Sequence, residues 1–176
     1  MSPTAIEQIR TGTWKLDPVH STVGFLVTHD GVSKFRAQFE QAEATLRDGV
    51  LAGMAHTESV KTRVPQLKES LISLDFFNAA ETPMITFRST DIRVTDDGTA
   101  EVNGELTIRG VKRQVTAKGH AAHGQNIDGG EVVGFDLVAT IDRRDYGLNW
   151  QQPLPNGGDA VGWNVTLEVN LELAKA

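Results

Sequence analysis

The chain has 176 residues, a length that fits one domain, and its hydrophobic content of 39% is sufficient for a core. Seventeen Lys and Arg residues against 23 Asp and Glu give a net charge of −6. Without a basic block to face the phosphates, nucleic acid is excluded as an expected partner. The lack of cysteine excludes disulfides, zinc–thiolate sites and thiol nucleophiles.

The first residues do not have the pattern of a secretory signal. Such a signal needs an apolar stretch of about 7–15 residues, whereas Pro3, Glu7, Arg10 and Gly12 interrupt this segment. No window approaches the roughly 20 apolar residues of a membrane-spanning helix. We therefore expect a cytoplasmic protein without a membrane span.

Alternation of apolar and polar residues dominates the chain. It is clearest at the end, where Val165, Leu167, Val169, Leu171 and Leu173 alternate with polar residues. This pattern is typical of antiparallel strands with one buried face. Strands are predicted at residues 13–17, 20–29, 34–47, 52–60, 84–95, 99–108, 111–123, 131–142 and 160–173.

Turns and one helix separate these strands. Asp48-Gly49, Asp97-Gly98 and Arg109-Gly110 supply residues that tolerate a positive φ, and the Asp97-Gly98 pair predicts a hairpin. Leu67, Leu71 and Leu74 recur at helical spacing after Pro65, which suits a first helical turn. The pattern predicts a short amphipathic helix over residues 65–72, lying across one end of the sheet.

Many alternating strands in one chain leave exposed edges unless the sheet closes on itself. We therefore predict an all-β fold, an antiparallel eight-stranded barrel with a short helix near one end. A sandwich is the alternative architecture. The expected organisation is an N-terminal arm over residues 1–12 followed by a barrel domain over residues 13–176.

Several separated motifs resemble one family. They lie at residues 14–33, 74–77 with 83–90, 104–111, 142–150 and 161–162, and include WKLDPVHS, LDFF, GELTIRGV and DRRDYGLNW. In this order they resemble the YceI-like family of lipocalin-like, polyisoprenoid-binding proteins. The resemblance implies a lipocalin-like barrel that holds a long-chain isoprenoid lipid, such as a prenyl quinone or a prenyl phosphate.

An apolar lumen would be lined by inward-facing strand residues and by residues at its mouth. Phe76 and Phe77 have two interpretations, as a plug of the barrel end or as the lining of the mouth. Strand alternation places Arg143 on the same side as the inward-facing residues before it, so its side chain should point into the barrel. A buried arginine must pair with either a carboxylate or the anion of a ligand. The predicted ligand-binding residues are Phe25, Val27, Phe76, Phe77, Phe87, Leu106, Phe135, Leu137, Arg143 and Trp163.

Catalytic and metal sites are less well supported by the pattern. His20 and Ser21 are neighbours, so they should point to opposite faces and form no triad with Asp17. His120 and His123 should also point to opposite faces, which argues against a shared metal ion. We expect no catalytic residue, metal or cofactor.

The sequence therefore favours a non-enzymatic protein that carries or sequesters an isoprenoid inside the barrel. Two other classes stay open. One is an enzyme for a hydrophobic small molecule, with Asp17 and His20 or Arg143 and Asp145 at the mouth. The other is a solid, ligand-free interaction module. A homodimer is also left open.

Overall fold

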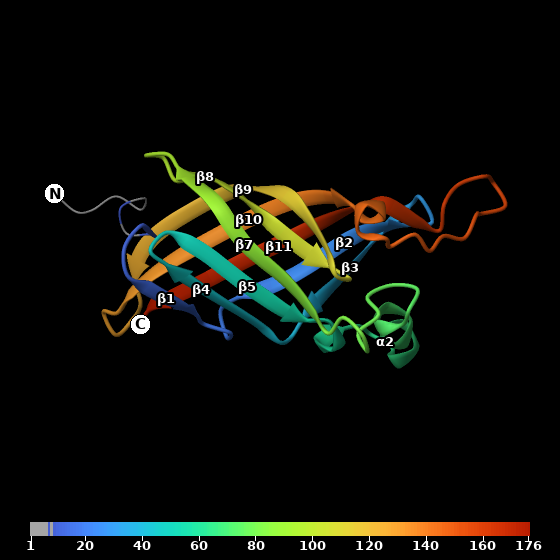
Figure 1. Ribbon diagram of the computed structural model, residues 1–176, viewed down its shortest axis with the longest axis horizontal. Coiled ribbons are helices and arrows are strands. Elements are labelled where there is room, and N and C mark those ends of the chain that lie inside the picture. Colours follow the sequence, from blue (N-terminus) through green and yellow to red (C-terminus); the bar gives the residue numbers. More distant parts are fainter. Residues whose placement is uncertain (1–6, 8) are drawn as a thin grey trace.

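The sheet closes into a barrel in the computed structural model, which describes residue 7 and residues 9–176. Eight antiparallel strands follow one another around the ring in the order β1, β4, β5, β7, β8, β9, β10 and β11, and β11 pairs with β1 again (Figure 1). Their bounds are β1 Thr13–Leu16, β4 Ala42–Arg47, β5 Val50–His56, β7 Met84–Val94, β8 Thr99–Ile108, β9 Val111–Gln125, β10 Glu131–Asp142 and β11 Val161–Lys175. The predicted eight-stranded barrel is confirmed, and the sandwich alternative is wrong because the sheet has closed.

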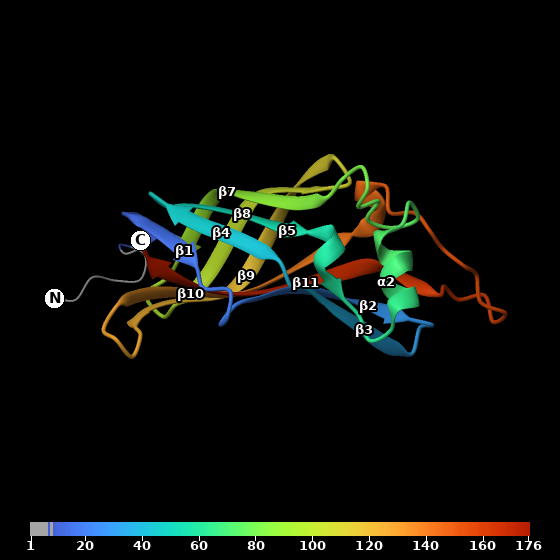
Figure 2. The ribbon, with the colours of Figure 1, turned by 90° about the horizontal axis from the view of Figure 1, so that it is seen from below.

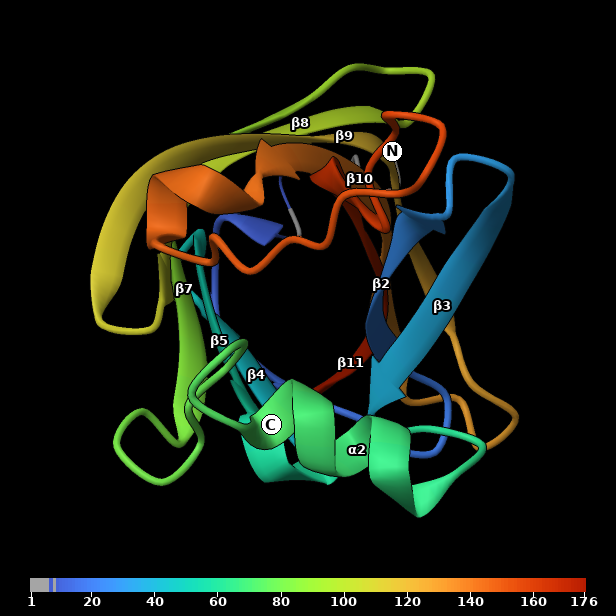
Figure 3. The same cartoon turned by 90° about the vertical axis from the view of Figure 1, so that its right-hand side faces the viewer.

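Three further strands extend this ring, namely β2 (Thr22–His29), β3 (Ser33–Phe39) and the two-residue β6 (Val60–Lys61). They are possible because β11 is long: β1 pairs with its last residues, whereas β2 pairs with its residues from Val161 to Asn170. The strands β2 and β3 therefore continue the wall at one end of the barrel. Figure 3 shows α2 (Pro65–Ile72) lying across the gap between β3 and β5 at that end.

The predicted helix is confirmed at residues 65–72. Pro65 occupies the first turn, where its missing N–H costs no hydrogen bond. The helix ends at Ile72, and the N–H of the next residue, Ser73, donates to the Ser70 carbonyl. The chain then folds back so that the Phe77 N–H donates to the Leu71 carbonyl. A short 3₁₀ turn, η1 (Thr57–Ser59), precedes this region and a second, η2 (Arg143–Tyr146), follows β10.

Two strand predictions differ from the structure. The strand expected at residues 52–60 ends at His56, because residues 57–59 form η1 and Val60 belongs to β6. Residues 34–47 were expected to form a single strand, but they form β3 and β4 with a corner at residues 40–41. Ser59 stabilises this corner, because its carbonyl accepts from the Glu40 N–H and its hydroxyl accepts from the Gln41 N–H. The apolar positions change phase at this corner, from Phe35, Ala37 and Phe39 to Ala42, Ala44 and Leu46, so the sequence marks the break that the prediction missed.

The turn predictions agree with the backbone. Gly98 has φ 87° in the β7–β8 hairpin, and Arg109 and Gly110 have φ 52° and 76° in the β8–β9 turn. Asp97 also accepts a hydrogen bond from the Thr99 N–H at 3.0 Å, which fixes the hairpin.

The two ends of the barrel differ. We call the end with α2, η2 and the β2–β3 turn the mouth, and the opposite end, where β1 and the C-terminus lie, the closed end (Figures 1 and 2). The closed end is packed solid around Trp14, Leu46 and Leu173, all fully buried. Ile9, from the predicted arm, packs into the same cluster, whereas residues 1–6 and 8 lie outside the described part. The boundary between residues 12 and 13 stays a prediction.

Candidate functional site

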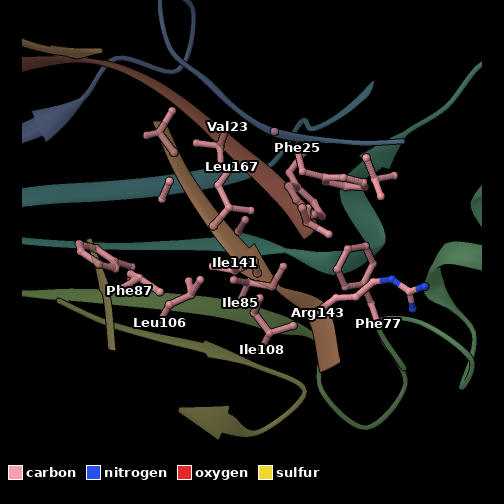
Figure 4. Close-up of a pocket in the computed structure, with 18 of the residues that line it drawn as sticks. Val23, Phe25, Phe77, Ile85, Phe87, Leu106, Ile108, Ile141, Arg143 and Leu167 are labelled. Atoms are coloured by element: carbon pink, nitrogen blue, oxygen red, sulfur yellow. The ribbon is translucent and has the colours of Figure 1, made fainter. Parts of the chain in front are cut away.

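The mouth half of the barrel is hollow. A cavity of about 500 Å³ extends from Val102, Leu137 and Leu171 in the middle of the barrel to Leu67 and Leu71 of α2. Figure 4 shows apolar side chains of β2, β7, β8, β10 and β11 facing this common space. The cavity is therefore a lumen lined almost wholly by hydrocarbon and bounded by packed side chains at its inner end.

The hollow arises from the residue types that face inward. Leu, Ile and Val dominate, and small side chains such as Ala117 and Ala139 leave space that larger ones would fill. The missing side chain of Gly104 also matters, because it lets the Phe87 ring lie directly against β8. A Cβ at residue 104 would lie 2.5 Å from that ring. The lumen is thus set by side-chain volumes as well as by strand number.

An aromatic cluster narrows the mouth. The rings of Phe25 and Phe39 both pack on Phe77, with centroids 5.9 and 5.6 Å away, and Phe76 packs on Trp150 at 5.5 Å. Phe76 and Phe77 also line the cavity, so both interpretations of this pair hold together: they cover the barrel end and they form the wall of its entrance.

Most of the predicted lining residues meet in this cavity. The eight that line it are Phe25, Val27, Phe76, Phe77, Phe87, Leu106, Leu137 and Arg143. Phe135 and Trp163 do not line it. Phe135 faces inward, but it is buried in the closed-end core, two residues before Leu137 on the same strand, and is only 2% exposed. The alternation predicts which face of the sheet a side chain lies on, but not how far along the barrel axis it lies. A register shift in β11 between Val161 and Val165 displaces Trp163.

Other lining residues escaped the sequence analysis. Leu67 and Leu71 line the lumen from α2, and their helical spacing was visible although their orientation was not. Val115 and Ala117 continue the wall on β9. Their alternation is present in the sequence, but many polar residues on β9 make it weak.

Arg143 is a structural cation of the mouth. Its Nε donates to the Gly162 carbonyl at 2.9 Å and its Nη1 to the carbonyls of Leu148 and Trp150 at 2.7 and 2.8 Å. Its Nη2 donates to the Val161 carbonyl at 3.1 Å. Among the described residues it forms no ion pair, so the expected carboxylate partner is absent and carbonyl dipoles take its place.

The charges around Arg143 are satisfied separately. Burial lowers the pKa of Arg143 from its ordinary value, and the nearby Asp142 opposes that shift. Asp142 itself binds Arg144, whose Nη2 lies 2.6 Å from a carboxylate oxygen, and these hydrogen bonds lower the Asp142 pKa to about 2. In Figure 4 the guanidinium of Arg143 points away from the apolar side chains of the lumen. Its hydrogen bonds to backbone carbonyls therefore hold residues 148–162 to the barrel.

Asp17, His20 and Ser21 do not form a triad. His20 Nδ1 lies 2.7 Å from an Asp17 carboxylate oxygen, which raises the His20 pKa, while the Ser21 hydroxyl accepts from the Glu172 N–H at 3.0 Å. None of the three lines the cavity. These hydrogen bonds stabilise the connection between β1 and β2 where it passes Glu172 of β11.

The two histidines of β9 lie as expected. His120 is exposed on the outer face, whereas His123 packs edge-on against Trp14 with ring centroids 6.2 Å apart. They therefore cannot bind one metal ion. Within the described part of the chain, no helix combines the length and hydropathy that crossing a bilayer requires.

Comparisons with known proteins agree with this fold. The sequence profile of the YceI-like domain matches residues 14–173. A UPF0312 protein of Staphylococcus epidermidis is 29% identical over 171 residues, covering 92% of this chain and 96% of that protein. A UPF0312 protein of Staphylococcus aureus is 29% identical over 167 residues, covering 90% and 95%.

Solved structures share the architecture. The YCEI protein of Campylobacter jejuni superposes with a TM-score of 0.71 at 21% identity, over 85% of this chain and 90% of that one. Burkholderia cenocepacia BcnA gives 0.69 at 20% identity, over 89% and 98%. A polyisoprenoid binding domain of Saccharophagus degradans gives 0.67 at 15% identity, over 93% and 98%. With its profile matched from Trp14 through Leu173, the chain belongs to the YceI-like family.

Proposed function

We propose that this protein binds a long-chain isoprenoid lipid in its lumen and carries or sequesters it in the cytoplasm without transforming it. The observation that carries the proposal is the apolar cavity of about 500 Å³ in the mouth half of the barrel. The YceI-like profile and the fold shared with a polyisoprenoid binding domain support this ligand class. A cavity too small for an alkyl chain would favour a ligand-free interaction module, and a volume of about 500 Å³ argues against that alternative.

The cavity volume sets the length of chain that it can hold. A dry cavity of about 150 Å³ lined by apolar residues accepts one six-carbon benzene ring. By that ratio, the lumen takes on the order of 20 carbon atoms, or about four isoprene units. A longer prenyl chain would keep its first units inside and pass the remainder through the mouth.

The apolar tail supplies most of the affinity. Each isoprene unit contributes on the order of 3 kcal/mol before the cost of ordering the chain is subtracted. The guanidinium of Arg143 is engaged by four backbone carbonyls and is not free for a headgroup. A prenyl quinone and a prenyl phosphate should therefore bind through the same tail contacts, with the headgroup near the mouth.

A cavity-filling variant tests the proposal. Ala139 lines the lumen, so Ala139→Phe fills part of it, whereas Val138→Phe places the same ring on the outer face of β10, where Val138 is exposed. Binding of a fluorescent C20 prenyl probe should weaken tenfold or more in A139F and stay unchanged in V138F. Native mass spectrometry of protein from its host should show a prenyl lipid in the wild type.

The proposal is wrong if the wild type binds no prenyl probe and carries no lipid from its host. It is also wrong if V138F and A139F lose the same affinity, because binding would then not take place in the lumen. Turnover of the probe by the wild type would contradict the non-enzymatic role. The homodimer stays a separate prediction, which sedimentation velocity can test.

A further inference from the structure

The mouth of the barrel exposes apolar side chains from three separate segments. Val32 is 88% exposed in the β2–β3 turn, and Leu74 is 68% exposed just after α2. Val64, directly before α2, and Trp150, in the loop after η2, are exposed as well. Figure 3, which looks onto this end, shows the β2–β3 turn, α2 and the loop after η2 arranged around the ring of strands, and the lumen lies inside that ring.

Charge is distributed unequally between this end and the rest of the protein. The mouth segments, residues 29–34, 57–83, 109–113 and 142–160, hold nine Lys and Arg against eight Asp and Glu. The net charge of the mouth segments is therefore +1. The remainder of the chain has a net charge of −7, and the two together give the −6 of the whole chain. An anionic surface would repel the body of the protein but not its mouth.

The loop after η2 is suited to the same contact. Residues 146–158 contain no charged side chain and include Leu148, Trp150, Leu154 and two prolines. In Figure 1 this loop projects beyond the rest of the barrel at the mouth. Tryptophan is enriched where hydrocarbon meets polar headgroups, since its ring is apolar and its N–H is polar.

We propose that the mouth is a membrane-docking face, with Val32, Leu74 and Trp150 entering the headgroup region of a lipid bilayer and the lumen opening toward it. The proposal rests on the proposed function, because docking by the mouth serves a barrel that exchanges an apolar ligand. Its basis is continuity between the exposed apolar rim and the apolar lumen, together with the neutral charge of this end. With the mouth docked on the bilayer, a prenyl chain passes from the bilayer into the lumen with little exposure to water.

Vesicle flotation with matched variants tests the docking face. Val32→Gln with Leu74→Gln removes two exposed apolar side chains from the mouth. Val19→Gln with Ile127→Gln removes two that are 81% and 102% exposed outside the mouth segments. The wild type should float with phosphatidylcholine vesicles, the mouth pair should bind at least tenfold more weakly, and the control pair should bind as the wild type does.

Two further readouts sharpen the test. Tryptophan emission should shift to the blue with vesicles, because Trp150 is exposed, whereas Trp14 is buried and Trp163 is half-buried. On phosphatidylglycerol vesicles, binding should strengthen as salt screens the acidic body. A wild type that fails to float, or equal losses in both pairs, would overturn the proposal. Self-association that V32Q/L74Q abolishes, without vesicle binding, would instead assign the surface to a second copy and overturn it too.

Uptake of the soluble C20 probe without vesicles separates this inference from the proposed function. Normal uptake by V32Q/L74Q shows that the variant is folded and that the lumen is intact. If the wild type takes up the probe but ignores vesicles, docking fails and ligand binding stands. If it floats with vesicles but takes up no probe, the proposed function fails and the docking inference loses its ligand-exchange role.

Discussion

The guanidinium carbon of Arg143 lies 4.3 Å from the centroid of the Trp163 ring, and hydrogen bonds to four carbonyls surround its edge. Arg144 approaches the same ring at 4.6 Å but binds Asp142 in solvent. Two adjacent arginines therefore share one aromatic ring, and only the buried one holds the loop after η2 to β11.

Arg143→Ala should lower the free energy of unfolding by about 3 kcal/mol, because it leaves buried carbonyls without donors. Arg143→Lys should recover only part of this loss, since an ammonium group lacks the planar fork. Urea denaturation measures both values. Arg144→Ala is the control and should cost less than about 1 kcal/mol, because its ion pair is exposed. Equal losses in the Arg143 and Arg144 alanine variants would contradict this role for Arg143.

Gly104→Ala should destabilise the barrel and reduce its capacity. A Cβ at this position would lie 2.5 Å from the Arg88 carbonyl oxygen and 2.5 Å from the Phe87 ring, which lines the lumen. We expect a loss of about 2 kcal/mol in unfolding free energy and weaker probe binding. Gly124→Ala, where no atom lies within 4 Å of the added Cβ, is the matched control in β9 and should change neither value by much. A G104A protein as stable as G124A would show that the strands relax freely.

Tyr146 is the single tyrosine of the chain, so the phenolate absorbance reports it alone. Burial, with a smaller contribution from the charge of Asp145, raises its pKa to about 12. Spectrophotometric titration should therefore show ionisation near pH 12 in the native protein and near pH 10 in urea. Because the unfolded chain loses this proton first, stability should decrease as the pH rises from about 10 toward 12. Native ionisation near pH 10 would contradict the burial of Tyr146.

The Asp17–His20 hydrogen bond should be visible in an NMR titration of His20. Its pKa should lie above the ordinary value of 6.5, chiefly because of the hydrogen bond to Asp17, and Asp17→Asn should lower it. A raised histidine pKa stabilises the folded state below pH 6.5, and this contribution disappears as the pH rises through the folded-state pKa. The same midpoint in the wild type and D17N would exclude the interaction in solution.

Local physical chemistry alone determined much of the fold. The alternation in β10 and β11 fixed which side chains face inward, since successive strand residues point to opposite faces. Pro65 and the leucine spacing gave the bounds of α2, and the Asp97-Gly98 pair gave its hairpin, because each depends on residues close in sequence. Eight of the ten predicted ligand-binding residues line the cavity for the same reason.

Tertiary structure decided what depends on distant residues. Ser59 holds the corner between β3 and β4, and the partners of Arg143 are carbonyls between residues 148 and 162, contacts that no local pattern identifies. Phe135 and Leu137 share a face, a strand and the closed-end core cluster, yet only Leu137 also lines the lumen. Parity specifies direction, whereas a hollow depends on the summed volumes of side chains that meet only after the barrel has closed.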